Sequence, residues 1–236
     1  KLFESDFSQA LNTEVNVINN HTEFFLNPEF QERVKVIHNN TRPDWSNGNL
    51  AENWNQALLH GFKDLNKPDS EYVVTMQNDT SVHPEWYSNL MKMHKKFDFI
   101  VGKYGDNLVS YTPEAVKKIG IWDENFFGVQ YKEADYWLRA LIFNKEKSCI
   151  NDTLHGIELN NEDALELDTT IDRNFIEEDG FKGENTLKRR ADDKEHQQIW
   201  STRGGAYKQY VWIYFQEKWA GTWSEAPSKG RWIKNW

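Results

Sequence analysis

Three consecutive polar residues, Gln77, Asn78 and Asp79, follow the apolar run Tyr72–Met76, which the sequence predicts to be a buried strand. They would place carboxylate and amide oxygens at the carboxyl end of that strand, the edge where α/β sheets bind ligands. Hard cations such as Mg²⁺ and Mn²⁺ prefer oxygen ligands of this kind. The alternative is an ordinary turn, in which Asn and Asp side chains bond their own backbone.

Strands and helices alternate along the chain around this segment. The predicted strands are Glu14–Ile18, Val34–Ile37, Tyr72–Met76, Phe97–Val101 and Leu108–Tyr111. The predicted helices are Leu2–Leu11, Leu50–Phe62, Pro84–Lys96 and Pro113–Ile119. This alternation predicts an α/β fold with a mostly parallel sheet flanked by helices.

Composition narrows the class of protein. The chain of 236 residues can form one domain with a substantial core. Its net charge of −9 argues against nucleic-acid binding. No apolar run reaches the roughly 20 residues that span a bilayer, so no transmembrane segment is expected. The single cysteine, Cys149, excludes an internal disulfide, and together with the missing signal-peptide pattern it predicts a cytoplasmic location.

The chain changes character after residue 150. Asn151–Lys194 is acidic and polar, which is typical of a solvated loop or lid, and Gln197–Trp219 predicts an aromatic helical tail. We therefore divide a single domain into a core at residues 1–150 and a lid with a helical extension at residues 151–236. Aromatic residues make up 14% of the chain, and their faces suit sugars, although they more often fill cores.

Five segments, in order, resemble the inverting, nucleotide-sugar-dependent glycosyltransferases of the GT-A fold called family 2. The segments are Glu14–Thr22, Arg33–Phe62 with its Asn-rich element Glu52–Ala57, Tyr72–Trp86, Ile119–Arg139 and Lys218–Gly221. The resemblance implies transfer of a sugar from a nucleoside diphosphate sugar to a hydroxyl acceptor, such as a glycan. It also implies that residues 1–150 form the nucleotide-sugar-binding core and that the reaction is a metal-assisted inverting displacement.

The resemblance implies a Mn²⁺ or Mg²⁺ ion bound by Asp79. A metal ion that bridges both phosphates would stabilise the charge of the leaving group. Gln77 stands where the family has the first Asp of its Asp-x-Asp motif, and it would contact the nucleotide sugar together with Asn78 and Asp79. His155 would be a further metal ligand, although a lone histidine is more often structural. Asp79 could instead cap the next turn.

Inverting displacement also needs a carboxylate that takes the proton from the acceptor hydroxyl. The acidic pair of the family corresponds here to Lys132 and Glu133, so the resemblance implies that Glu133 is the general base. Asp135 is the second candidate, although its position four residues before Arg139 also suits an ion pair within a helix.

The remaining expected contacts also follow from the resemblance. Further nucleotide-sugar contacts are expected of Asn19, Asn20, Asn55, Arg189 and Arg190. The two arginines would close over the diphosphate, or they would simply offset the acidic run. Trp122, Asp123 and Glu124 are expected to line the acceptor site, or only to begin a loop.

One element of the family is missing from the sequence. Family members normally begin with a strand that forms a wall of the nucleotide pocket. Its absence and the presence of Gln77 favour an alternative from another class, a non-catalytic carbohydrate-binding domain that kept the fold. A nucleotidyltransferase would need a second carboxylate beside Asp79, and we identify none in the sequence.

Overall fold

The computed structural model describes residues 2–10, 12–20, 26–39, 50–77, 80–103, 105–126, 131–152, 157–160, 170–171 and 213–219. The longer strands are β1 (Val15–Asn19), β2 (Val34–His38), β3 (Val73–Met76), β5 (Phe99–Val101), β6 (Leu108–Tyr111), β7 (Ser148–Asp152) and β8 (Ile157–Leu159). The helices are α1 (Leu50–Phe62), α2 (Trp86–His94), α3 (Pro113–Ile119) and α4 (Lys132–Phe143), and residues 213–219 are also helical. Shorter elements are β4 (Thr80–Ser81), β9 (Thr170–Ile171) and the 3₁₀ helices η1 (Leu2–Glu4), η2 (Asp6–Gln9), η3 (Pro28–Phe30), η4 (Gly105–Asn107) and η5 (Lys145–Lys147).

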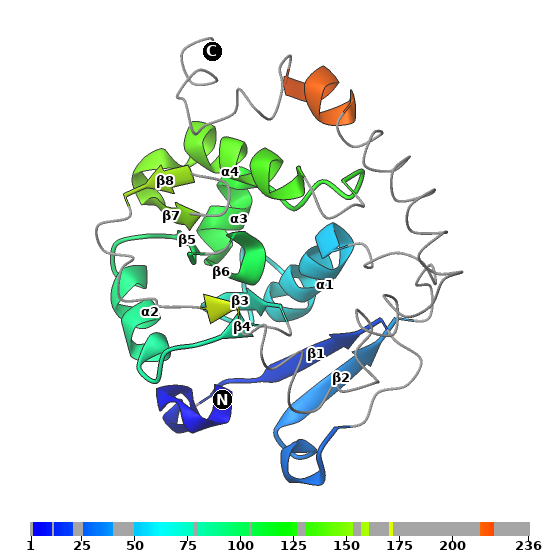
Figure 1. The fold of residues 1–236 in the computed structure, drawn as a ribbon, viewed down its shortest axis with the longest axis vertical. Coiled ribbons are helices and arrows are strands. Elements are labelled where there is room, and N and C mark those ends of the chain that lie inside the picture. The colour runs from blue at the N-terminus through cyan, green and yellow to red at the C-terminus, as the bar shows by residue number, and fades with distance from the viewer. Residues whose placement is uncertain are drawn as a thin grey trace.

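A five-stranded sheet in the order β3-β6-β5-β7-β8 forms the centre of the described structure (Figure 1). Only β5 and β7 pair in parallel within this sheet, while β6 and β8 run antiparallel to their neighbours. The predicted α/β fold is confirmed, but the prediction of a mostly parallel sheet is wrong. Residues 102–107 join β5 to β6 and are too few for the crossover that parallel neighbours require.

Strands β1 and β2 form a separate two-stranded parallel sheet, in which Val15 pairs with Val34 and Asn19 with His38. Strands β4 and β9 form a second small sheet, which is antiparallel. Within the described residues, no strand connects the β1–β2 sheet to the five-stranded sheet.

Helices cover both faces of the five-stranded sheet. Phe99 and Val101 of β5 pack with apolar residues of α1, α3 and α4 in one buried cluster. Ile100, which lies between them, packs in a second cluster with residues of α2. Because successive side chains of a strand point to opposite faces, these two clusters define a three-layer arrangement of helices, sheet and helix.

The element boundaries agree closely with prediction in the centre of the chain and less well at its start. Helices α1 and α3 and strand β6 begin and end at the predicted residues. The predicted helix Leu2–Leu11 is instead split into η1 and η2. Ser5 causes the break, because its hydroxyl accepts a hydrogen bond from the Phe7 N–H and donates one to the Leu2 carbonyl.

The second half of the chain is described only in part. The predicted division at residue 150 falls inside β7. Most of the acidic stretch Asn151–Lys194 and the first part of the predicted tail helix lie outside the described residues. Within the described part of the chain, no helix has the length and apolar character needed to cross a membrane.

Candidate functional site

Side chains from α1, the end of β3, η4 and α4 meet around the buried residue Asp106. Its Oδ2 accepts hydrogen bonds from Trp54 Nε1 at 3.0 Å and lies 2.9 Å from Lys132 Nζ, while Oδ1 accepts from Gln77 Nε2 at 2.5 Å. Lys132 Nζ also contacts Glu133 Oε1. We call these five residues the Asp106 cluster. It joins Gln77, which was predicted from the strand end, to Glu133, which the family resemblance implies to be the general base.

Two hydrogen bonds to the Asn107 carbonyl hold the end of β3 and the start of β4 against η4. The Gln77 N–H donates to the Asn107 carbonyl at 3.1 Å, and Thr80 Oγ1 donates to the same carbonyl at 2.9 Å. Asn107 itself is buried, and its side-chain Nδ2 has no hydrogen-bond partner among the described residues. Asn78 and Asp79, which follow Gln77 directly, lie outside the described residues.

The charged groups of the Asp106 cluster are almost completely removed from water. The side chains of Lys132, Asp106 and Glu133 are 1%, 6% and 5% exposed. Burial raises the pKa of Asp106. The charge of Lys132 and the hydrogen bonds that the Asp106 carboxylate accepts have the larger, opposite effect, so its net pKa lies below the usual value. Burial lowers the pKa of Lys132, but the two carboxylates outweigh it and the net pKa lies above its usual value. Lys132 and Asp106 therefore form a true ion pair.

The first turn of α4 positions Lys132, Glu133 and Asp135. The helix begins after Tyr131, whose φ of 71° places it in the left-handed region. Such a conformation is costly for a residue other than glycine, and here it stands directly before the turn that contains Lys132, Glu133 and Asp135. The positive end of the helix dipole also favours carboxylates at this position.

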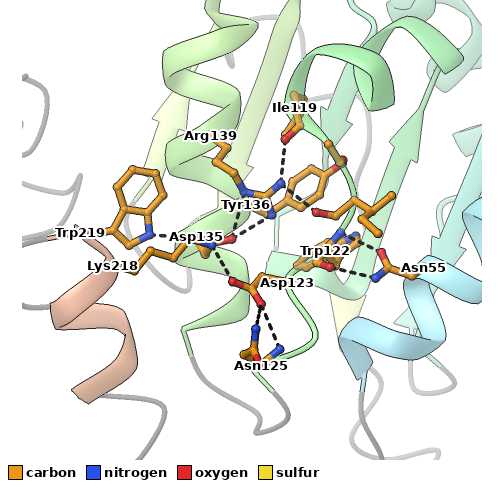
Figure 2. A network of polar contacts seen from close by, with 12 residues as sticks. Asn55, Ile119, Trp122, Asp123, Asn125, Asp135, Tyr136, Arg139, Lys218 and Trp219 are labelled. Carbon is orange, nitrogen blue, oxygen red and sulfur yellow. Dashed lines mark hydrogen bonds and ion pairs between the residues drawn. The ribbon is translucent and has the colours of Figure 1, made fainter.

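A second polar network surrounds Asp135 and is shown in Figure 2. Asp135 Oδ2 accepts from Arg139 Nε at 3.0 Å and from Nη2 at 2.9 Å. Asp135 Oδ1 lies 2.7 Å from Lys218 Nζ and accepts from Trp219 Nε1 at 2.9 Å. We call Asp123, Asp135, Arg139, Lys218 and Trp219 the Asp135 cluster. It attaches the helix at residues 213–219 to α4.

Asp123 completes this network from the loop that follows α3. Its Oδ2 accepts from Lys218 Nζ and from the Tyr214 hydroxyl, each at 2.7 Å. Burial raises the pKa of Asp123, but the hydrogen bonds from Lys218, Tyr214 and Asn125 outweigh it and lower the pKa to about 2. Burial and the adjacent carboxylate raise the pKa of Tyr214 to about 12. Asp123 is thus ionised and already bound to protein donors.

Asn55 holds the other predicted acceptor residues in place. Its Oδ1 accepts from the Trp122 N–H, while its Nδ2 donates to the Trp122 carbonyl and to Glu124 Oε1, all at 2.8 Å (Figure 2 shows the bonds to Trp122). Asn55 is fully buried on α1. The described contacts therefore join Asn55 to the loop at residues 122–124, where acceptor contacts were predicted, and give it a positioning role.

The predicted nucleotide-binding residues Asn19 and Asn20 lie at the end of β1, in a network of amides. Asn19 Nδ2 lies 3.1 Å from His38 Nδ1. Asn39 Nδ2 donates to Asn20 Oδ1 and to Gln56 Oε1, each at 2.9 Å. Because Gln56 belongs to α1, this network connects the β1–β2 sheet to the helix that also supplies Trp54 and Asn55.

The metal prediction is not supported by the described residues. Within this part of the chain, no group of three or more His, Cys, Asp or Glu residues could hold a metal ion. The carboxylate that contacts Gln77 is that of Asp106, and both Asp106 and Glu133 contact the ammonium of Lys132. Asp79 and His155, on which the metal prediction rests, lie outside the described residues, as do Arg189 and Arg190.

Sequence reasoning missed Asp106, the residue that brings the first cluster together. Gly105, Asp106 and Asn107 look like an ordinary turn between two strands, and no motif marks them. Asp106 is 52 positions from Trp54 and 29 from Gln77, so only the packing of α1 and the pairing of β3 with β6 reveal the contacts. Lys218 and Trp219 were noticed only as part of a motif, without a role.

Comparisons of the chain with protein-family models and with curated proteins find no match.

Proposed function

We propose that the protein is a glycosyltransferase that moves a sugar from a nucleoside diphosphate sugar to a hydroxyl acceptor with inversion. The observation that supports this most is the contact network between the end of β3 and the first turn of α4 in the Asp106 cluster. A donor site at a strand end and a carboxylate from another element that meets it are the two groups that a direct displacement needs.

In this proposal Glu133 is the general base. The acceptor oxygen attacks the anomeric carbon, the bond from that carbon to the diphosphate breaks, and the electron pair leaves with the diphosphate. The acceptor proton passes to the Glu133 carboxylate. Asp135 is a poorer candidate for this step, because it is 0% exposed and its two oxygens are occupied by Arg139, Lys218 and Trp219.

The donor would bind beside Gln77. Asn107 Nδ2 is a buried donor that no described residue uses, and a buried donor of this kind suits a ligand oxygen. Asn78 and Asp79 follow Gln77 in the sequence and are proposed to contact the donor as well, and Arg189 and Arg190 are proposed to contact the diphosphate. Asp79 and His155 remain the proposed ligands of a Mn²⁺ or Mg²⁺ ion, and the step described above does not depend on that ion.

A second candidate function is a carbohydrate-binding domain without catalytic activity. The contact of Lys132 with Glu133 favours it, because an acidic pair of the family is replaced here by an ion pair. Gln77 in place of a carboxylate points in the same direction. Such a domain would bind glycans or nucleotide sugars but would not break the bond to the diphosphate.

Binding of nucleoside diphosphates tests the proposal before any reaction is attempted. The melting temperature of the protein would be measured with UDP, GDP, ADP and CDP, each with and without Mn²⁺. We expect one of these nucleotides to raise the melting temperature by several degrees, since a ligand of the native state stabilises it by mass action. No response to any of the four would contradict the proposal.

Substitution of Gln77 by Ala locates the site. It should weaken the nucleotide response, whereas His83→Ala, in an exposed position after β4, should leave it unchanged. Equal responses of both variants would place the nucleotide elsewhere and contradict the proposed donor site.

A further inference from the structure

Lys132 is buried, and burying the charged side chain of a lysine costs free energy. Its ammonium group is buried with only 1% of the side chain exposed, and it lies between two carboxylates from different elements. One carboxylate, Asp106, comes from η4 next to the end of β3, and the other, Glu133, comes from the first turn of α4. Charged lysines are rarely buried unless paired, so this arrangement requires a reason.

We propose that the ammonium of Lys132 is a built-in cation that takes the place of a divalent metal ion between Asp106 and Glu133. The inference concerns cation binding by these three residues and holds whether or not the protein transfers sugars. It states that the Asp106–Glu133 pair binds no Mn²⁺ or Mg²⁺ as long as Lys132 is charged.

The contacts explain why a metal ion and Lys132 exclude each other. Mn²⁺ and Mg²⁺ coordinate carboxylate oxygens at about 2.0–2.2 Å, and one or two carboxylates together with water molecules can hold such an ion. Lys132 Nζ already lies 2.9 Å from Asp106 Oδ2 and in contact with Glu133 Oε1. An ion bridging these oxygens would occupy the space of the ammonium and would be repelled by its charge.

The remaining contacts of the Asp106 cluster show that the carboxylates are arranged around a cation. Trp54 Nε1 and Gln77 Nε2 donate to the two oxygens of Asp106, which fixes the orientation of its carboxylate toward Lys132. The two carboxylates and the one ammonium leave a single negative charge in a buried place. Removing the ammonium would leave two negative charges close together, and such a pair attracts a divalent cation.

Lys132→Met tests the proposal, because it keeps an unbranched side chain of nearly the same length and removes the charge. The Lys132 variants would be made in an Asp79→Asn background, so that metal binding at Asp79 does not contribute. Mn²⁺ binding would be measured by the electron paramagnetic resonance signal of free Mn²⁺, and stability by thermal unfolding. We expect Lys132→Met to bind one Mn²⁺, and an Mn²⁺ concentration 100 times the dissociation constant to raise its melting temperature by about 5–10 °C.

Two matched variants isolate the charge. Lys132→Arg keeps it and should bind no Mn²⁺ at this pair. The double variant Lys132→Met with Glu133→Gln lacks one carboxylate and should bind Mn²⁺ at least about tenfold more weakly than Lys132→Met alone. Equal Mn²⁺ affinity of Lys132→Met and the Asp79→Asn parent would overturn the proposal, as would equal affinity of Lys132→Met and the double variant.

Two substitutions in the natural sequence test the same proposal and do not depend on the folding of Lys132→Met. If the ammonium excludes metal, Glu133→Gln and Asp106→Asn in the natural sequence leave its Mn²⁺ affinity within about twofold. A loss of about tenfold in either variant would show that these carboxylates already bind the ion, and it would overturn the proposal.

Discussion

Trp219 Nε1 donates a hydrogen bond of 2.9 Å to Oδ1 of Asp135, across 84 positions of the sequence. Lys218, the preceding residue, lies 2.7 Å from the same oxygen. The helix at residues 213–219 is therefore attached to α4 through a buried carboxylate, and Phe215 of this helix packs with Phe126 in a small apolar cluster.

Trp219→Phe is expected to weaken this attachment. The change keeps most of the apolar surface but removes a donor from a carboxylate that is 0% exposed, which costs about 1.5–3 kcal/mol of unfolding free energy. Urea unfolding measures the change. Lys117→Met, which removes a surface ion pair with Glu114, is the control and should have little effect. Equal stability of Trp219→Phe and the natural protein would contradict the described attachment.

Asn55→Ala is expected to destabilise the loop at residues 122–124. The substitution leaves the buried N–H of Trp122 without its acceptor, and such a group costs about 1–3 kcal/mol. The melting temperature should fall by several degrees. Gln56→Ala, in the next position of α1, removes partly buried amide contacts and should cost less. A larger loss for Gln56→Ala would show that Asn55 does not hold this loop.

Gly61→Ala is expected to push α1 away from β3 and so to destabilise the protein. A Cβ atom at this position would collide with Cγ2 of Val73, so helix and strand approach here as closely as their atoms allow. Overpacking of this kind costs about 1–3 kcal/mol, even though alanine favours the helix. Leu59→Ala on the same helix is a control, because Leu59 is 62% exposed. Equal stability of Gly61→Ala and Leu59→Ala would contradict the close approach of α1 to β3 at this position.

Stability is expected to fall in mild acid because of His94. Its Nδ1 lies 3.1 Å from the Phe97 carbonyl and its Nε2 lies 2.6 Å from Ser110 Oγ, so the neutral ring donates to the first and accepts from the second. Burial lowers the pKa of His94 to about 4 from an unfolded value of about 6.5. The unfolded state therefore gains the proton first as the pH falls.

The contribution of His94 is complete above about pH 6.5 and is lost as the pH falls toward about 4. The pKa difference corresponds to about 3 kcal/mol. Urea unfolding of the natural protein and of His94→Gln between pH 4 and 7 measures it, because the difference between the two curves isolates this residue. A difference that does not change over this range would contradict the assignment.

The sequence predicted those elements whose ends are set by local chemistry. Helix α3 begins at Pro113 after Thr112, whose side chain accepts from the Ala115 N–H, and it ends at Ile119, before Gly120 with a φ of 89°. Each of these residue types marks a helix end on its own. The direction of β6 follows from the short connection at residues 102–107 rather than from the residues of the strand, so strand patterns alone missed it although the predicted strand ends already implied it.

The candidate site was predictable only where one segment contained the signal. Gln77 follows an apolar strand and Glu133 stands in a recognisable acidic segment, so both were identified and the structure brings them into one cluster. Asp106 was not, because its partners are distant in sequence. Asp135 was predicted in two roles, and its 2.9 Å contact with Arg139 confirms the helix ion pair, while a catalytic role remains a prediction.

Turnover by Glu133→Gln tests the central claim most directly. The released nucleoside diphosphate would be measured with the nucleotide sugar of the nucleotide that binds and a set of hydroxyl acceptors, with Glu146→Gln as an exposed acidic control. The account predicts that Glu133→Gln still binds the nucleotide but releases it about 10²–10⁴ times more slowly than the natural protein. Equal rates for Glu133→Gln and the natural protein, or no release by either, would contradict it.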